Sequence, residues 1–389
     1  MKKIIFCLQT MVLGGVEKEL ITVLKKIHRD FDITLLLLYP DDTEILKEIP
    51  EDVKLVFADI DREYYFGSTA HVVKQRIKKG KIPEAVGIAV KRFLKRGMTG
   101  SNVSMENIPV YGEDFDVAIC YHIHSSFLLR YVTEKIRAKK KVAWIHNDFY
   151  ISGYPVQRLK PYVVRYDEFV AVSKKVKSEF SALCPWYAGG VSTAYNYLDV
   201  DEIEARSREE ADDSRYTEHS AFKILTVGRF SEEKGIDLAI IASSLLKKMD
   251  LDFHWFIMGC GALEDTYREL IEAHGVGDRV TILGRKQNPY PYIRNCGIQV
   301  QPSRHEAYPL VIMEAKILKK PIVCASFNGA DEQIQHGVNG LIVPRNDAVA
   351  LAEAVAGLIR SPETRAAFTR ELEAWQPEDA LREIVRHLQ

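Results

Sequence analysis

Long apolar segments, paired cysteines and low-complexity tracts are all missing from this sequence. No hydrophobic run approaches the roughly 18 residues that a membrane-spanning helix needs, which argues against a membrane-embedded protein. The six cysteines are scattered and include no C-x-x-C pair, so they predict buried free thiols rather than a zinc site or a disulfide framework. Asp-x-Asp tripeptides occur at unrelated places along the chain, and we therefore predict no metal ion and no cofactor.

A secretory leader and a dinucleotide-binding fingerprint are missing as well. Residues 3–8 form a short apolar run, but polar Gln9 and Thr10 interrupt it and no small-residue cleavage site follows. We therefore expect a buried strand there. The unpaired cysteines, expected to be buried free thiols, predict a cytoplasmic protein. A Rossmann oxidoreductase would need G-x-G-x-x-G after this strand, and the chain offers only Gly14-Gly15.

The bulk composition is that of a soluble protein with two domains. The chain has 389 residues, 47% hydrophobic and 28% charged, and is too long for one ordinary core. The net charge is −1, so no nucleic-acid partner is expected. Nine lysines and arginines but only one acid lie within Tyr64–Gly100, interleaved with apolar residues. This segment is either a solvated helix face or a contact with an anionic membrane surface, and the second reading predicts peripheral attachment at the inner face of the cell membrane.

Short apolar runs alternate with helical patterns along the whole chain. In the second half, Leu238, Ile241, Ala242, Leu245 and Met249 are spaced three and four apart, as on one face of a helix. This alternation predicts an α/β fold of parallel sheets with helices on both faces. The expected strands of the first half are 3–8, 33–38, 53–57, 117–121, 142–146 and 168–172. Those of the second half are 224–227, 253–258, 280–283, 298–300, 322–325 and 341–343.

The polar stretch Asp201–Glu218 has few apolar residues, suits a linker and marks the expected domain boundary. We predict a first domain over residues 1–199 and a second over residues 200–374. A break at Pro377 separates a final helix within residues 375–389, and we expect this helix to pack back on the first domain.

Two glutamates, Glu306 and Glu314, lie where the strand 298–300 leads into a helix near Leu310. In open parallel sheets, ligands bind outside the carboxyl ends of the strands, where such loops run into helix N-termini. Eight helical positions would rotate the two side chains about 80° apart, so they converge only if Glu306 lies in the loop before the helix. Pro309, which is tolerated at a helix start, places it there. Two carboxylates at this joint predict a site for a polyhydroxyl ligand.

The ends of two other expected strands carry groups suited to a phosphorylated ligand. Arg229 and Lys234 follow the strand 224–227, and two fixed cations ahead of a helix suit a diphosphate. Gly259 and Gly261 follow the next strand, where glycine allows close approach of the backbone. Each pair is weak by itself, because surface charges and turn glycines are common.

The first half supplies two further candidates at strand ends. Gly14-Gly15 lies between a strand and a helix, where backbone N–H groups can meet a phosphate or a sugar. His146 ends the run Val-Ala-Trp-Ile-His and is polar at the point where the strand stops being apolar. We expect all these groups at the ligand-binding ends of two sheets.

Together these motifs resemble the retaining family-four glycosyltransferases, also called glycosyl transferases group 1, which have the GT-B fold. The similarity covers most of the chain and is most specific between Val227 and Pro344. There the chain reads, in order, G-R-x5-K-G, G-x-G, L-G, Q-P-S-x-x-E-x7-E-A and H-G-x-N-G-L-I-V-P. The first half contributes Gly-Gly-Val-Glu17, Ile-His146-Asn-Asp148, Val-Ser173 and Tyr-Asn196-x-x-Asp199. The resemblance implies two Rossmann-like domains that face each other across a cleft.

The resemblance also implies roles for individual residues. Arg229 and Lys234 would bind the diphosphate of a nucleotide-sugar donor, and Glu314 would bind the ribose hydroxyls. Glu306 would lie beside the transferred sugar, with His146 near the reacting sugar. The other donor-binding residues would be Gly15, Gly228, Gly259, Gly261, Ala307, Tyr308, Pro309 and Leu310. The residues expected to act in catalysis are His146, Glu306, Arg229 and Lys234.

The implied reaction is transfer of a sugar from a UDP-sugar to a glycan or lipid-linked acceptor in polysaccharide or glycolipid synthesis. Charge grows on the departing phosphate, and preorganised cations and amides can stabilise it without a metal. The chain departs from the family pattern at Ala307, where glycine is usual, at Tyr197 in the Asn-Gly turn, and at Gly297, where aspartate is frequent. The first departure predicts a reshaped sugar pocket.

Two alternatives remain open from the sequence. A nucleotide-sugar epimerase of the same architecture would share the donor domain and act on its substrate without an acceptor. A non-catalytic nucleotide-sugar-binding partner subunit would bind the donor and show no turnover.

Overall fold

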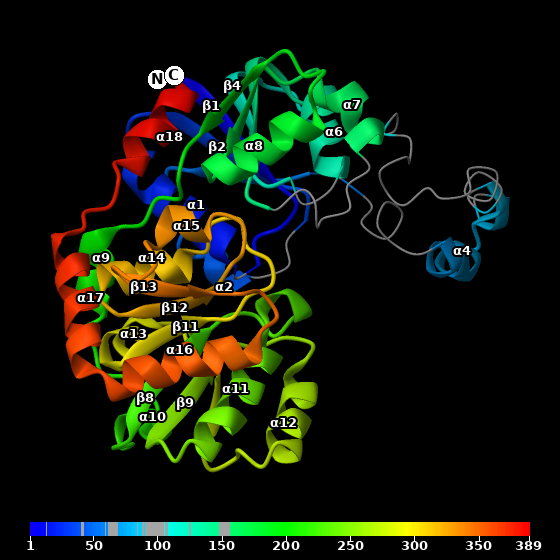
Figure 1. Ribbon diagram of the computed structural model, residues 1–389. Coiled ribbons are helices and arrows are strands. Elements are labelled where there is room, and N and C mark those ends of the chain that lie inside the picture. The colour runs from blue at the N-terminus through cyan, green and yellow to red at the C-terminus, as the bar shows by residue number, and fades with distance from the viewer. Residues whose placement is uncertain are drawn as a thin grey trace.

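The computed structural model describes residues 1–12, 14–39, 43–58, 60, 69–83, 85–87, 89, 105, 108–123, 126–147 and 156–389. Two parallel sheets, each with helices on its faces, form two lobes stacked one above the other (Figure 1). The prediction of two parallel-sheet domains of the GT-B type is confirmed. Many residues of the central strands are fully buried, because helices cover both faces, and this explains why the strands read as short continuous apolar runs.

The sheet of the first lobe has seven strands within the described ranges, in the order β3-β2-β1-β4-β5-β6-β7. The chain changes direction across the sheet between β1 and β4, which is the topological switch point of this lobe. The strands are β1 Lys3–Leu8, β2 Asp32–Leu37, β3 Lys54–Phe57, β4 Asp114–Cys120, β5 Arg137–Ile145, β6 Glu168–Ala171 and β7 Gly190–Thr193. The helices are α1 Gly15–Ile27, α2 Thr43–Leu46, α4 Thr69–Lys78, α6 Ser126–Lys135, α7 Val156–Val163 and α8 Lys174–Leu183.

The sheet of the second lobe has six strands in the order β10-β9-β8-β11-β12-β13, which is the Rossmann order. Its switch point lies between β8 and β11. The strands are β8 Phe222–Val227, β9 Phe253–Met258, β10 Val280–Gly284, β11 Ile298–Gln301, β12 Ile322–Ala325 and β13 Gly340–Val343. The helices are η2 Glu232–Lys234 (a 3-10 turn), α11 Ile236–Lys248, α12 Glu264–Ala273, α13 Tyr290–Asn295, α14 Leu310–Ile317, α15 Ala330–Gln333, α16 Ala348–Arg360 and α17 Pro362–Ala374.

The stretch expected to be a linker is instead folded, and that prediction is wrong. Residues 201–218 contribute to two short helices, α9 Val200–Arg206 and α10 Ser214–Thr217. Ile203 and Tyr216 are almost fully buried, and the Tyr216 hydroxyl donates to the carbonyl oxygen of Tyr292 at 2.6 Å. A few apolar side chains suffice to anchor this segment because they pack into a core that the rest of the second lobe provides. The edge strand β7 was also not predicted, since Gly-Val-Ser-Thr is not an apolar run.

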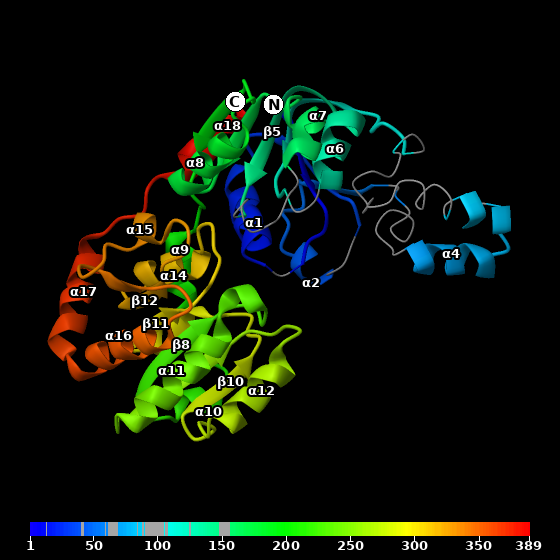
Figure 2. The ribbon, with the colours of Figure 1, turned by 45° about the vertical axis from the view of Figure 1, so that its right-hand side comes forward.

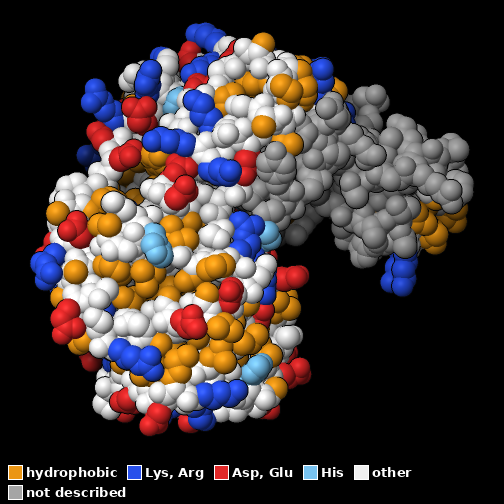
Figure 3. Space-filling model, in the orientation of Figure 1, with side chains coloured by type: hydrophobic (Ala, Val, Ile, Leu, Met, Phe, Trp, Pro, Cys, Tyr) orange, Lys and Arg blue, Asp and Glu red, His pale blue; other side chains and the backbone are white. Residues whose placement is uncertain are grey.

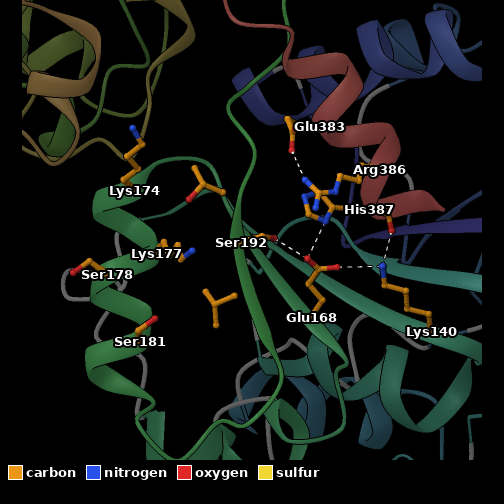
Figure 4. A pocket seen from close by; sticks show the side chains of 12 residues that line it. Lys140, Glu168, Lys174, Lys177, Ser178, Ser181, Ser192, Glu383, Arg386 and His387 are labelled. Atoms are coloured by element: carbon orange, nitrogen blue, oxygen red, sulfur yellow. Dashed lines mark hydrogen bonds and ion pairs between the residues drawn. The ribbon is translucent and has the colours of Figure 1, made fainter.

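The last helix, α18 Ala380–Leu388, lies against the first lobe, next to the N-terminus (Figures 1 and 2). Ile384 and Leu388 belong to the hydrophobic core of that lobe. Figure 4 shows the polar part of the contact, in which Glu168 accepts from the His387 ring Nδ1 at 2.9 Å and from the Ser192 hydroxyl at 2.8 Å.

The two lobes are joined by hydrogen bonds that groups of the first lobe donate to a carboxylate on α15. The Glu332 carboxylate accepts from the backbone N–H groups of Lys174 and Lys175, at 2.9 and 2.8 Å, and from the Tyr195 hydroxyl at 3.0 Å. A carboxylate of the second lobe therefore caps a helix of the first.

The basic segment of residues 64–100 is described only in part. On α4 and just after it, Lys74, Lys78 and Lys79 are exposed, and the Ile77 side chain is 52% exposed. Other residues of the predicted membrane contact, among them Lys91 and Arg92, lie outside the described residues. Within the described ranges, no helix combines the length and the apolar character needed to cross a membrane.

Candidate functional site

A cavity of about 500 Å³ lies between the two lobes, at the carboxyl ends of strands from both sheets. The cleft between the lobes opens on the right of Figure 3. Both switch points face it, since its walls include the residues after β1, β8 and β11. The predicted residues that line it are Gly15, His146, Gly228, Arg229, Lys234, Gly259, Glu306, Ala307, Tyr308, Pro309, Leu310 and Glu314.

Gly261 is the predicted site residue that does not line the cavity. A Cβ atom at Gly261 would lie 2.6 Å from the carbonyl oxygen of Phe230, and one at Gly259 would lie 1.8 Å from that of Gly228. Both glycines therefore allow the loop after β9 to pack against the loop after β8. The position of Gly261 behind that loop indicates a structural role.

Lys234 and Glu306 form an ion pair in the wall of the cavity. Nζ lies 2.6 Å from Oε1, and the two side chains are 17% and 9% exposed. The same oxygen accepts from the Ser303 hydroxyl at 2.8 Å and from the Gln301 amide at 3.1 Å. No residue of the described ranges hydrogen-bonds Glu306 Oε2. Glu306 Oε1 therefore fixes the loop after β11 to the loop after β8. Glu306 Oε2 can accept a hydrogen bond from a ligand.

Arg229 is the more exposed of the two predicted cations. Its side chain is 66% exposed, and its nearest acidic partner in the described ranges is Glu233, at 3.7 Å. Such a long, exposed pair holds the guanidinium only weakly. Arg229 can therefore reorient toward an anion in the cavity.

Glu314 lies on α14, which begins at Leu310 after Pro309 in extended conformation. The glutamate is 7% exposed, and burial raises the pKa of its carboxyl, against the opposing charges of Lys18 and Arg206. The first N–H groups of an α-helix have no partner within the helix and suit an anion. Glu306 on the loop and Glu314 on α14 therefore line the same cavity, together with the first turn of the helix. The two glutamates converge because Glu306 lies in the loop before the helix.

His146 directly follows β5 and is 9% exposed. Burial, together with the neighbouring His122 ring at 5.9 Å, lowers the pKa of His146 well below its ordinary value. Its Nε2 atom has no hydrogen-bond partner in the described ranges. The ring is therefore neutral at physiological pH, and its buried Nε2 atom lies in the cavity wall without a partner in the described ranges.

Several lining residues were not predicted from the sequence. Glu17 and Lys18 stand on the first turn of α1, and Arg285 and Lys286 follow β10. The rule that selected Arg229, a cation just after a strand, would also have selected these last two. Asn196 lines the cavity as well, and its amide donates to the carbonyl oxygen of Tyr308 at 2.9 Å, which steadies the loop before α14.

A second hollow, of about 780 Å³, lies between α8, β7 and α18 (Figure 4). It borders the edge of the first sheet and includes none of the strand ends at the switch points. Its central carboxylate, Glu168, is already paired with His387 and Lys140. This hollow belongs to the docking of α18, so the cavity between the lobes is the candidate site. Within the described ranges no group of three or more His, Cys, Asp or Glu side chains could hold a metal ion.

Comparison with known sequences gives two kinds of match. Residues 207–375 match the family model of the glycosyl transferases group 1. The alpha-D-kanosaminyltransferase of Streptomyces kanamyceticus is 30% identical over 256 residues, which cover 60% of this chain and 65% of that protein. The amylovoran biosynthesis glycosyltransferase AmsK of Erwinia amylovora is 33% identical over 142 residues, covering 34% of this chain and 35% of that protein. The chain thus spans less than two thirds of the length of these relatives.

Solved structures match over the whole chain. The Anabaena protein HepE in complex with UDP-glucose superposes with a TM-score of 0.72, at 17% identity, covering 100% of this chain and 99% of that one. The lipopolysaccharide outer core galactosyltransferase WaaB superposes with a TM-score of 0.63, at 15% identity, covering 100% and 99%. Because the sequence identity is this low, these matches establish only the fold of the two lobes.

Proposed function

Since the chain belongs to the glycosyl transferases group 1 and has the GT-B fold, we propose that it transfers a sugar, with retention of configuration, from a UDP-sugar to an acceptor hydroxyl. The observation that carries this proposal is the convergence of Arg229, Lys234, Glu306 and the start of α14 on one cavity between the lobes. Two cations, a carboxylate and free helix amides at a switch point suit a diphosphate joined to a sugar.

Arg229 and Lys234 are the residues proposed to stabilise the leaving group. Negative charge accumulates on the diphosphate as the sugar departs, and fixed cations in a partly closed cleft interact with it more strongly than water does. Lys234 is already held in place by Glu306, so it needs little reorganisation when the donor binds. Arg229 is free to fold over the outer phosphate.

The carboxylates and the histidine are proposed to orient the sugar and the nucleotide. Glu306 Oε2 would accept a hydrogen bond from a hydroxyl of the transferred sugar, and Glu314 would accept from the ribose hydroxyls. The neutral His146, which lines the cavity, would hydrogen-bond the reacting sugar. A neutral ring avoids placing a further positive charge at a centre where an oxocarbenium-like state develops.

The proposed acceptor is a glycan or a lipid-linked glycan. Relatives act in amylovoran biosynthesis and in the lipopolysaccharide outer core, and we extend that acceptor class to this chain. The exposed lysines on and near α4 support contact with an anionic bilayer from the cytoplasmic side, where each basic residue near the surface adds about 1 kcal/mol. Co-sedimentation with anionic liposomes that does not weaken when Lys78 and Lys79 are reversed to glutamate would refute this contact.

Nucleotide-sugar binding tests the function without knowledge of the acceptor. Purified protein should be screened with UDP-, GDP- and ADP-sugars for an increase in Tm, because a ligand at one hundred times its Kd stabilises by about 2.7 kcal/mol. Stabilisation by a UDP-sugar that is lost in Arg229→Ala and Lys234→Ala supports the proposal. Absence of stabilisation by every nucleotide sugar refutes it. Conversion of the donor to its epimer without an acceptor would instead identify an epimerase.

A further inference from the structure

Glu17 is a buried carboxyl in the wall of the cleft for which the proposed reaction gives no role. It stands in the first turn of α1 and is 6% exposed, yet it lines the cavity opposite the loop of Arg229. Its side chain folds back over the start of its own helix. A Cβ atom on Gly14 would lie only 2.5 Å from Glu17 Oε2, so glycine at this position is what leaves room for the carboxyl.

The carboxyl occupies a place that suits an anion. The start of α1 has backbone N–H groups without helical partners, and Gly14 caps it without a side-chain hydrogen bond. The Glu17 backbone N–H stabilises the ionised carboxyl, and Arg229 does so through its charge. Gly15 at the same helix start and Arg229 are the groups proposed to meet the donor's diphosphate. When Glu17 is ionised, the protein therefore carries its own negative charge where a phosphate is expected.

A diphosphate and an ionised Glu17 cannot share this place without a large repulsion. Like charges a few ångströms apart in a partly desolvated site raise the pKa of the weaker acid by one unit or more. Burial already raises the pKa of Glu17 to about 7, against the opposing effects of its own N–H and of Arg229. A further rise on donor binding would cross the neutral range.

We propose that the ionised Glu17 carboxylate holds the place of the donor's diphosphate before the donor binds, takes up one proton from solvent on binding, and then donates a hydrogen bond to a phosphate oxygen. This inference rests on the proposed function, because it requires a diphosphate between α1 and Arg229. It assigns a role to the Gly-Gly-Val-Glu17 motif. The first glycine makes room for the Glu17 carboxyl, and that carboxyl loses its negative charge when the negatively charged diphosphate binds.

Other ionisable groups border the same cavity, and the test must separate them from Glu17. Two of them matter most. Histidine in general titrates near neutral pH, which makes His122 a candidate, whereas His146 is held neutral. Burial also raises the pKa of Glu19, which accepts from the Tyr121 hydroxyl, to about 7. Within the described ranges, the other ionisable groups that line the cavity are Lys18, Arg229, Lys234, Cys260, Arg285, Lys286, Glu306, Tyr308 and Glu314, and Tyr121 lies against Glu19.

The experiment is calorimetric titration of UDP-glucose into the full chain at about pH 7.5, in two buffers with different heats of ionisation. The diphosphate diester of UDP-glucose has no titration of its own near neutral pH. With a resting pKa of about 7, binding should take up as much as about three quarters of a proton per site. The Kd should rise roughly tenfold or more between pH 6.5 and pH 8.5.

Glu17→Gln should bind UDP-glucose with almost no proton uptake and with a nearly flat pH dependence. Gly14→Ala displaces the carboxyl without removing it and should lose the proton uptake as well. This variant replaces Glu17→Gln as the test if Glu17→Gln does not fold. His122→Gln and Glu19→Gln are the matched controls, and both should retain the uptake.

Three results overturn the proposal. Wild-type binding without proton uptake does so, as does uptake that persists in Glu17→Gln or disappears in His122→Gln or Glu19→Gln. If the wild type and all variants fail to bind UDP-glucose or any other nucleotide sugar, the proposed function fails, and this inference fails with it. Binding without uptake refutes the role of Glu17 alone.

Discussion

The ion pair between Lys234 and Glu306 offers the sharpest test of the site, because its strength can be measured without a substrate. We predict that Lys234→Met destabilises the second lobe by about 2–3 kcal/mol. Removing one partner of a buried pair typically costs 3–5 kcal/mol. The lower value follows because Lys234 is 17% exposed, and because Ser303 and Gln301 still donate to the stranded carboxylate.

A double-mutant cycle isolates the pair itself. Glu306→Gln alone leaves the ammonium group facing a neutral amide and should cost about 1–2 kcal/mol. In Lys234→Met/Glu306→Gln neither charge is left unpaired, so the double variant should be more stable than the sum of the single changes predicts. The expected coupling is about 1.5–3 kcal/mol, which is the contribution of a hydrogen bond to a charged group.

The assay is urea unfolding of the full chain, followed by circular dichroism and by fluorescence so that separate transitions of the two lobes can be recognised. The pair Arg229–Glu233 is the matched control, since its atoms are 3.7 Å apart and both side chains are exposed. A cycle on that pair should give a coupling below about 0.5 kcal/mol. Additivity at Lys234 and Glu306 within about 0.5 kcal/mol would refute the buried, preorganised pair.

Three further predictions concern other charged or titratable groups. Glu314→Gln should weaken UDP binding by about one to two powers of ten, because a hydrogen bond to a charged group is worth about 1.5–3 kcal/mol. The affinity is measured by calorimetry, and an unchanged affinity would mean that the site is misplaced. His146→Ala should lower kcat far more than it raises the Kd of the donor. Near-normal turnover of the variant would mean that His146 has only a structural role at the end of β5. At Glu168, burial raises the pKa, but the hydrogen bonds from His387, Ser192 and Lys140 and the charge of His387 outweigh it and lower the pKa to about 2. The stability that this carboxylate contributes is therefore present above pH 4.5 and lost as the pH falls toward 2. Glu168→Gln should remove that part of the acid dependence in unfolding titrations, and an unchanged acid profile would contradict it.

Much of the fold could be predicted from local patterns. A strand covered by helices on both faces must be apolar along its whole length, so runs such as Phe253–Met258 predicted their strands to the residue. The candidate site followed from the same logic. Polar and small residues just after such runs, Arg229 and His146 among them, mark strand ends, and ligands of parallel sheets bind at strand ends.

Other features could not be predicted, because their cause lies in distant parts of the chain. The segment around Ile203 and Tyr216 reads as a polar linker, and it folds because a core built by other residues receives those two side chains. Lys234 and Glu306 are predictable as site residues, but their pairing depends on β8 and β11 lying side by side across the switch point.

The sequence by itself therefore determined which residues form strands and which groups stand at their ends, because burial and helix geometry impose periodicities of a few residues. The tertiary structure decided which of those groups meet. Gly14 and Glu17 are three residues apart, yet only the folded start of α1 brings the carboxyl over the glycine, and only the opposing lobe brings Arg229 near it. Contacts of this kind depend on the order of strands in a sheet and on the packing of two sheets, which no local pattern encodes.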